Sequence, residues 1–220
     1  SDGLLAVGGD LSPERVLYAY QNGIFPWYES DQPVLWWAPD PRFVLYPHKL
    51  KVSKSLKQMM RNQSFEITIN RNFKDVIEAC ANVKRNAQSG TWITDEMIKT
   101  YCDLHQRGFA KSVEVWQNKK MVGGLYGVEL NDTIFCGESM FSYVSNASKI
   151  GFTTFVQNKE KYMNNYSDLE VIFPNAIIDK ISVVDNLGIV ENIGVWKKIT
   201  NIYKNLLQEE NTNNKNMENM

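Results

Sequence analysis

The 220-residue sequence predicts an α+β fold. Three apolar runs between residues 111 and 137 are separated by polar turns at Asn118–Lys120 and Asn131–Asp132, which indicates an antiparallel meander. Helical patterns precede and follow this meander and do not alternate with its strands. Because separate blocks of strands and helices are typical of α+β domains, we expect a central, mainly antiparallel sheet covered by helices.

The first 46 residues contain one predicted helix and several short extended segments. Ser12 is a favourable N-cap, Pro13 suits the first helical position, and Gly23 is expected to end this helix. The prolines between residues 25 and 42 preclude a long helix and favour short strands and tight turns. Residues 44–46 are expected to form a strand.

The middle of the chain contains three predicted helices and one predicted strand. The helices are at about 53–62, 72–83 and 95–107, and the strand is at 65–69. The last helix has the clearest boundaries, since Thr94 can cap its N-terminus and Gly108 can end it.

The C-terminal part begins with a helix opened by Asn146–Lys149, with Phe152 and Phe155 facing inward. One or two strands within 171–183 and a last helix at 195–207 are expected to follow. Three regions are therefore predicted: a small N-terminal α+β domain at 1–62, a larger domain at 63–207, and an Asn- and Glu-rich tail at 208–220 that we expect to be disordered.

Composition limits the classes of protein to consider. With 24 basic and 25 acidic residues the net charge is −1, so a polyanionic partner would need a local basic patch. Cys80, Cys102 and Cys136 are widely separated and have no CxxC spacing, which argues against a disulfide framework or a zinc site and favours a reducing compartment. No apolar run approaches the ~20 residues of a membrane helix, so we expect a soluble cytoplasmic protein.

The segment Phe135–Phe141 (FCGESMF) combines polar and large apolar side chains. The carboxylate of Glu138 is costly among apolar neighbours unless its charge is paired or used, so this segment resembles a functional site. Ser139 lies outside a GxSxG motif, and His48 and His105 are the chain's two histidines. A Ser–His–Asp nucleophile is therefore not expected.

Six separated motifs, in the same order, resemble those of leucyl/phenylalanyl-tRNA–protein transferases. They are Gly3–Leu11, Gly23–Trp27, Leu35–Trp37 with Pro39–Arg42, Gly90–Thr94, Gly123–Gly127, and Phe135–Phe141 with Asn146–Lys149. The resemblance extends from residue 3 to about residue 156. A set of six motifs in order is far more specific than any one of them.

The resemblance implies a bacterial enzyme that transfers leucine or phenylalanine from aminoacyl-tRNA to proteins with N-terminal arginine or lysine, forming a peptide bond and marking them for degradation. It also implies a small N-terminal domain followed by an acetyltransferase-like (GNAT-type) domain. No cofactor is expected, since the aminoacyl ester is already an activated donor. Methionine is a further candidate donor, because an apolar pocket discriminates one methylene by only ~1–3 kcal/mol. We expect a monomer.

The same resemblance implies a substrate-binding set in which large apolar side chains form the pocket for the donor amino acid. The set is Trp37, Trp92, Phe135, Ser139, Met140 and Phe155. For the apolar members the alternative is an ordinary core role. Glu138 is expected to accept a hydrogen bond from the donor's α-amino group or to hold the acceptor amine; the alternative is a structural carboxylate satisfied by backbone amides.

Ester aminolysis requires a neutral attacking amine, and a carboxylate that receives its proton suffices as a general base. The family's Asp-x-Gln pattern points to Asp179, with Glu138, as the catalytic residues, but Ile181 stands where glutamine is expected. Residues 157–220 match the family pattern poorly, so an aminoacyl-tRNA-binding protein with impaired catalysis is the alternative function. A coenzyme-A-dependent acetyltransferase is less favoured, because the sequence lacks a glycine-rich pyrophosphate loop at the expected turn.

Basic residues gather on and before the predicted helix at 53–62. Lys54, Lys57 and Arg61 have i, i+3, i+7 spacing and are the predicted tRNA-binding residues. Phosphate contacts of this kind give sequence-independent, salt-sensitive affinity. The alternative is a solvated helix face.

Overall fold

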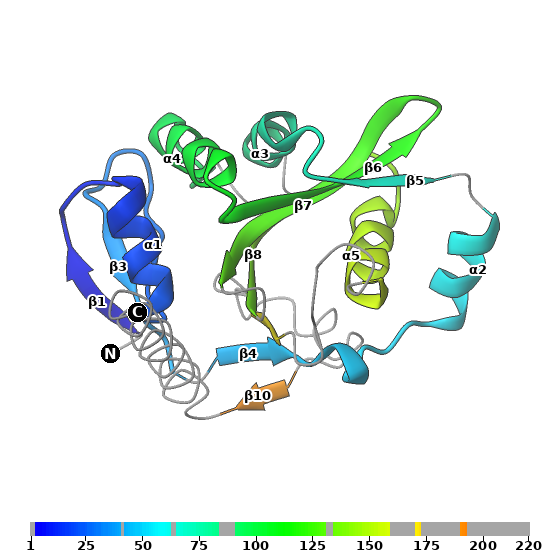
Figure 1. Cartoon of the computed structure of the whole chain (residues 1–220), viewed down its shortest axis with the longest axis horizontal. Coiled ribbons are helices and arrows are strands. Elements are labelled where there is room, and N and C mark those ends of the chain that lie inside the picture. The colour runs from blue at the N-terminus through cyan, green and yellow to red at the C-terminus, as the bar shows by residue number, and fades with distance from the viewer. Residues whose placement is uncertain are drawn as a thin grey trace, which may run out of the picture.

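A computed structural model describes residues 3–40, 42–62, 65–83, 91–130, 134–158, 170–172 and 190–192 (Figure 1). Its elements are β1 (Leu4–Val7), α1 (Pro13–Gln21), β2 (Phe25–Pro26), β3 (Leu35–Trp37), β4 (Arg42–Leu45), the short 3-10 helix η1 (Pro47–Lys49), α2 (Lys54–Asn62), β5 (Glu66–Ile69), α3 (Phe73–Asn82), α4 (Asp95–Gln106), β6 (Ala110–Gln117), β7 (Lys120–Leu130), β8 (Ile134–Ser142), α5 (Ala147–Gln157), β9 (Glu170–Ile172) and β10 (Val190–Asn192). The structure confirms the α+β class.

The N-terminal elements form a small antiparallel sheet with the strand order β1-β3-β2. Helix α1 follows β1; Pro13 is at its first position and Ser12 at its N-cap, although the Ser12 side chain makes no capping hydrogen bond. Gly23, with a φ of 76°, lies just beyond the end of the helix, as expected.

The central sheet has seven strands in the order β10-β4-β9-β8-β7-β6-β5. Strands β5 to β8 form a continuous antiparallel set, which confirms the predicted meander, whereas β8 and β9 pair in parallel. A parallel pair requires a crossover connection, and α5 lies between these two strands in the chain. The central sheet is therefore mainly antiparallel, as the sequence predicts.

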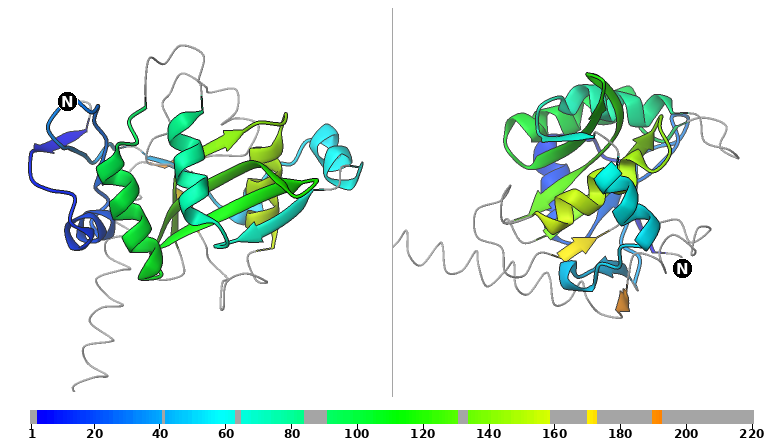
Figure 2. Two further views of the ribbon diagram at one scale, coloured as in Figure 1. Left: turned by 90° about the horizontal axis from the view of Figure 1, so that it is seen from above. Right: turned by 90° about the vertical axis from the view of Figure 1, so that its right-hand side faces the viewer.

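Helices α3 and α4 cover one face of the sheet and α5 covers the other (Figures 1 and 2). Adjacent residues of β7 show both faces: a Cβ added to Gly123 would lie 2.7 Å from the Cβ of Ala147 in α5, whereas one at Gly124 would lie 3.4 Å from Val76 in α3. Two apolar cores result, one on each face.

Some boundaries differ from the predictions. Strand β8 continues to Ser142, beyond the expected end at residue 137, and β1 and β10 were not predicted. Thr94 does cap α4, accepting a hydrogen bond from the backbone nitrogen of Met97 at 3.2 Å. The predicted helix at 195–207 and the tail lie outside the described residues. Strand β4 pairs within the central sheet, while the domain boundary at residue 62 stays a prediction.

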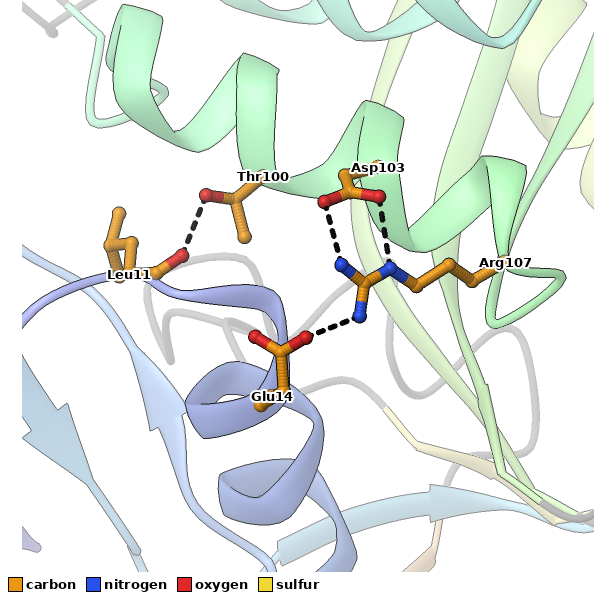
Figure 3. Close-up of polar contacts among 5 residues, drawn as sticks. All are labelled: Leu11, Glu14, Thr100, Asp103 and Arg107. Carbon is orange, nitrogen blue, oxygen red and sulfur yellow. Dashed lines mark hydrogen bonds and ion pairs between the residues drawn. The ribbon is translucent and has the colours of Figure 1, made fainter.

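Side chains of α4, and of Arg107 just beyond its end, contact the N-terminal segment (Figure 3). The buried Thr100 hydroxyl donates a hydrogen bond of 2.7 Å to the carbonyl oxygen of Leu11. At the surface, the Arg107 guanidinium pairs with both Asp103 of α4 and Glu14 of α1. Leu11, just before α1, and Glu14, in its first turn, are therefore held against the α4 segment by one buried and one exposed polar contact.

Candidate functional site

A β-bulge in β8 determines where Glu138 lies. Tyr126 of β7 pairs with Ser139, and the next residue, Gly127, pairs with Gly137, so Glu138 is an extra residue in β8. Such a bulge bends the strand and redirects its side chains. Glycine is required at position 127, since a Cβ there would overlap the backbone carbonyl oxygen of Cys136.

The Glu138 carboxylate is buried, with 5% of the residue exposed. Burial raises its pKa to about 8, although a hydrogen bond with Tyr20 and the positive charge of Arg42 act in the opposite direction. The carboxyl group is therefore mostly protonated at neutral pH, and small changes in its surroundings can ionise it. Beside it, Ser139 is partly exposed and Met140 is 37% exposed, so the accessible edge of the site lies here.

Two buried tyrosines from distant parts of the chain lie next to Glu138. The Tyr20 hydroxyl of α1 hydrogen-bonds that of Tyr101 of α4 at 2.6 Å, and burial raises the pKa of both phenols. The ring of Tyr101 in turn lies edge-on to that of Tyr126, with centroids 5.7 Å apart. The tyrosines thus join the N-terminal segment, α4 and β7 around one carboxylate.

Arg42 of β4 is the nearby cation, and 2% of it is exposed. Its Nη2 donates a hydrogen bond of 3.2 Å to the carbonyl oxygen of Gly23, and its guanidinium lies 4.5 Å from the centre of the Phe25 ring. Burial lowers its pKa to about 10, so Arg42 remains cationic at neutral pH. A fixed positive charge is thus available to stabilise the ionised form of Glu138.

The structure divides the predicted apolar pocket residues between the two cores. Phe135 and Phe155 are in contact, with ring centroids 4.9 Å apart, in the core on the α5 face. Met140 lies opposite Leu125, a member of the same core. Trp92 belongs to the other core, and Trp37 packs against that core.

Trp37 has a further aromatic neighbour that sequence reasoning did not single out. Its indole nitrogen donates a hydrogen bond of 2.7 Å to the carbonyl oxygen of Trp27, and the two indole rings meet edge-on at 5.7 Å. Tyr20, Tyr101 and Arg42 were also missed as site residues. Their spacing along the chain gives no signal, because only the fold brings them to Glu138.

The remaining predicted site residues lie apart from this cluster or outside the described part of the chain. Lys54, Lys57 and Arg61 are exposed on α2. Their assignment to tRNA binding stays a prediction. Asp179 falls outside the described residues, and so does Ile181.

Glu114 shows how a structural carboxylate differs from Glu138 in this fold. It is buried on β6 and accepts hydrogen bonds from the hydroxyls of Thr68 and Ser112 and from the backbone nitrogens of Arg71 and Asn72. Those backbone groups precede α3, so Glu114 fixes the start of that helix.

Within the ranges that the structure describes, no three His, Cys, Asp or Glu side chains gather in a way that could hold a metal ion. None of the helices in the same ranges combines the length and the apolar character needed to cross a bilayer.

Comparisons with known proteins agree on one family. A family model described as leucyl/phenylalanyl-tRNA protein transferase matches residues 44–180, and the model of that family's N-terminal domain matches residues 9–40. The chain is 51% identical over 180 residues to the leucyl/phenylalanyl-tRNA–protein transferase of Flavobacterium johnsoniae, covering 82% of this chain and 84% of that protein. It is 57% identical over 161 residues to the protein of the same name from Christiangramia forsetii, covering 73% and 76%.

Among solved structures, the chain is similar to a ribosomal-protein-alanine N-acetyltransferase from Brucella melitensis biovar Abortus 2308. The TM-score is 0.36 at 13% identity, covering 56% of this chain and 89% of that one.

Proposed function

Because the chain belongs to the leucyl/phenylalanyl-tRNA protein transferase family and is therefore an aminoacyltransferase, we propose that it transfers leucine or phenylalanine, with methionine as a further candidate, to proteins with N-terminal arginine or lysine. The product is a new peptide bond, which marks the acceptor for degradation. Charged tRNA supplies the amino acid in the cytoplasm, and the enzyme acts as a monomer without a cofactor.

The observation that carries this proposal is the buried carboxyl group of Glu138, which lies beside Tyr20 and Arg42 and whose pKa burial raises to about 8. An N-terminal amine has an ordinary pKa of about 7.7–8.0, so Glu138 is a base of comparable strength and can receive its proton. A carboxylate with an ordinary pKa near 4 would be a much weaker base. The neutral amine then attacks the ester carbonyl carbon and forms the C–N bond. As the ester C–O bond breaks, a proton from the attacking nitrogen passes to the leaving oxygen, so the tRNA leaves as its 3′ alcohol.

Arg42 and Tyr20 support the proposed base because they stabilise the ionised form of Glu138. When Glu138 holds the amine proton it is neutral, and when it is ionised Arg42 and the Tyr20 hydroxyl stabilise its charge. Neither residue donates to the reacting atoms in this scheme. Asp179 is proposed as the second catalytic carboxylate, on the basis of its place in the family pattern alone.

For the donor side chain we propose an apolar pocket bordered by Phe135, Phe155 and Met140. The two phenylalanines are in contact. Met140, which pairs with Leu125 of the same core, is partly exposed and flexible enough to fit a branched or a ring side chain. Trp37 and Trp92, which lie against or in the other core, are proposed as further substrate-binding residues separate from this pocket, and Ser139 lies at the accessible edge. The exposed cations of α2 are proposed to bind the tRNA backbone.

The proposal is tested by supplying purified protein with phenylalanyl-tRNA and a series of peptides that differ only at the first residue. Peptides beginning with arginine or lysine should become phenylalanylated, and peptides beginning with alanine or glutamate should not. Salt-sensitive tRNA binding without transfer to any peptide would instead support the alternative, a binding protein with impaired catalysis.

A further inference from the structure

One end of the molecule carries exposed cations from three segments that contain no acidic residue. The segments are residues 53–62 with α2, residues 117–123 with the β6–β7 turn, and residues 143–158 with α5. Their six exposed basic residues are Lys54, Lys57, Arg61, Lys119, Lys120 and Lys149. The net charge of the chain is −1, but these segments carry basic residues without acidic ones, so they form a local positive surface.

Contacts show that the three segments adjoin. The Asn146 side-chain nitrogen lies 3.6 Å from the sulfur of Met59, which joins the start of α5 to α2. The backbone nitrogen of Tyr143 donates a hydrogen bond of 2.8 Å to the carbonyl oxygen of Val122, next to the β6–β7 turn. Figures 1 and 2 place α2 and this turn together at the end remote from the N-terminal sheet.

Tyr143 is the exposed aromatic residue within this basic region. It is 60% exposed, and the centre of its ring lies 5.0 Å from that of the buried Phe141, against which it packs. Lysines that contact phosphates, together with an exposed aromatic ring on which a base stacks, are the combination with which proteins bind single-stranded nucleic acid. The acidic neighbour Glu66, at the start of β5, is ion-paired with Arg71 at 3.7 Å.

We propose that Tyr143, Lys149 and the β6–β7 turn extend the α2 surface into a binding site for the acceptor arm of tRNA. Tyr143 stacks on an unpaired nucleobase, and Lys119, Lys120 and Lys149 contact phosphates. The inference rests on the proposed function, since it names how the same substrate is held. Tyr143 follows Glu138 by five residues, about 16 Å of extended chain, so this surface binds nucleotides that precede the aminoacylated end.

The experiment measures tRNA affinity as a function of salt for matched pairs of variants. Tyr143→Ala should weaken tRNA binding about fivefold to a hundredfold, whereas Tyr143→Phe, which keeps the ring, should bind like the unaltered protein. Tyr18→Ala is the control, because Tyr18 is 69% exposed on α1 at the other end of the molecule. The double variant Lys119→Ala/Lys120→Ala should reduce the slope of log K against log salt by about 1.4–1.8, and Lys99→Ala on α4 should leave it unchanged.

A second donor separates this inference from the proposed function. With phenylalanyl-adenosine, which lacks the rest of the tRNA, Tyr143→Ala should transfer as fast as the unaltered protein. If the unaltered protein uses phenylalanyl-tRNA and Tyr143→Ala binds tRNA no more weakly than Tyr18→Ala, the stacking surface is refuted while the proposed function stands. If the unaltered protein transfers from neither donor, it is the proposed function that fails.

Discussion

The hydroxyl groups of Tyr20 and Tyr101 lie 2.6 Å apart, joining α1 to α4 beside the buried carboxyl group of Glu138. The two tyrosines are 81 residues apart in the sequence. Through this contact the N-terminal segment supplies part of the surroundings of a residue on β8. The pKa of Glu138, the proposed base, therefore depends in part on a residue of α1.

Removing the Tyr20 hydroxyl should shift the pH dependence of transfer. The hydrogen bond with Tyr20 lowers the pKa of Glu138, so Tyr20→Phe should raise that pKa and displace the rising limb of kcat/KM to higher pH. Each unit of displacement lowers the ionised fraction at pH 7 about tenfold. The exposed Tyr18→Phe is the matched control. An unchanged profile in Tyr20→Phe would show that Glu138 does not set the rate.

Glu138 should make the protein less stable as the pH rises. Its pKa is about 8 in the folded protein and 4.5 for an unperturbed glutamate, so between these pH values the folded state holds a proton that the unfolded state releases. This contribution to stability is complete below pH 4.5 and is lost as the pH rises through 8, by up to about 1.4 kcal/mol per pH unit. Urea unfolding at pH 5, 7 and 8.5 should therefore show a shallower decline for Glu138→Gln. Parallel curves for the two proteins would contradict the raised pKa.

The Thr100–Leu11 hydrogen bond and the Arg107–Glu14 ion pair should contribute differently to the free energy of unfolding. Thr100→Val keeps the shape of the side chain but leaves the buried carbonyl oxygen of Leu11 without this hydrogen bond, at a cost of about 1–3 kcal/mol in the free energy of unfolding. Arg107→Ala removes exposed ion pairs and should change stability little at moderate salt. Urea denaturation measures the free energy of unfolding of both variants. A larger loss of stability in Arg107→Ala than in Thr100→Val would show that the exposed ion pair matters more than the buried hydrogen bond.

Glu114 should matter for folding and not for catalysis. All four groups that contact the Glu114 carboxylate are hydrogen-bond donors. Glu114→Gln replaces one accepting oxygen by an NH2 group, which cannot accept from them, and should lower the free energy of unfolding by about 3 kcal/mol. Transfer per folded molecule should stay close to normal. Glu66→Gln on the neighbouring strand is the control, since Glu66 is exposed. A fully stable Glu114→Gln variant with low activity would give Glu114 a direct role.

Met140 offers the best test of the proposed donor pocket. Phe135 and Phe155 are fully buried, and their replacement by alanine would cost about 3–5 kcal/mol of stability and confuse the result. Met140→Ala should fold normally, bind tRNA as before, and change the ratio of kcat/KM for phenylalanyl- and leucyl-tRNA about tenfold. Equal losses for the two donors, matched by a loss of tRNA affinity, would remove Met140 from the pocket.

Local signals made much of the fold predictable. Thr94 and Gly108 bound α4, and the two polar turns define the meander, because capping and turn preferences depend on a few adjacent residues. Strand β1 escaped prediction since its four residues are all exposed and apolar, so no alternation appears. The bulge at Glu138 also left no local signal, because it depends on the pairing of β8 with β7.

The candidate site was less predictable than the fold. The FCGESMF segment indicated a carboxylate among apolar side chains, and Glu138 is indeed buried there. Arg42, Tyr20 and Tyr101 come from β4, α1 and α4, and their approach to Glu138 depends on how those elements pack. Of the five apolar residues assigned to one pocket, Phe135 and Phe155 lie in one core, Trp92 lies in the other with Trp37 packed against it, and Met140 is partly exposed.

The most direct test measures single-turnover transfer of phenylalanine from tRNA to an arginine-starting peptide, by the unaltered protein and by Glu138→Gln. Both proteins should bind phenylalanyl-tRNA with the same affinity, since the substitution is buried and nearly isosteric. The unaltered protein should transfer, and Glu138→Gln should be slower by about 10²–10⁴-fold, the usual contribution of a general base. Transfer at the same rate by both proteins would contradict the proposed role of Glu138.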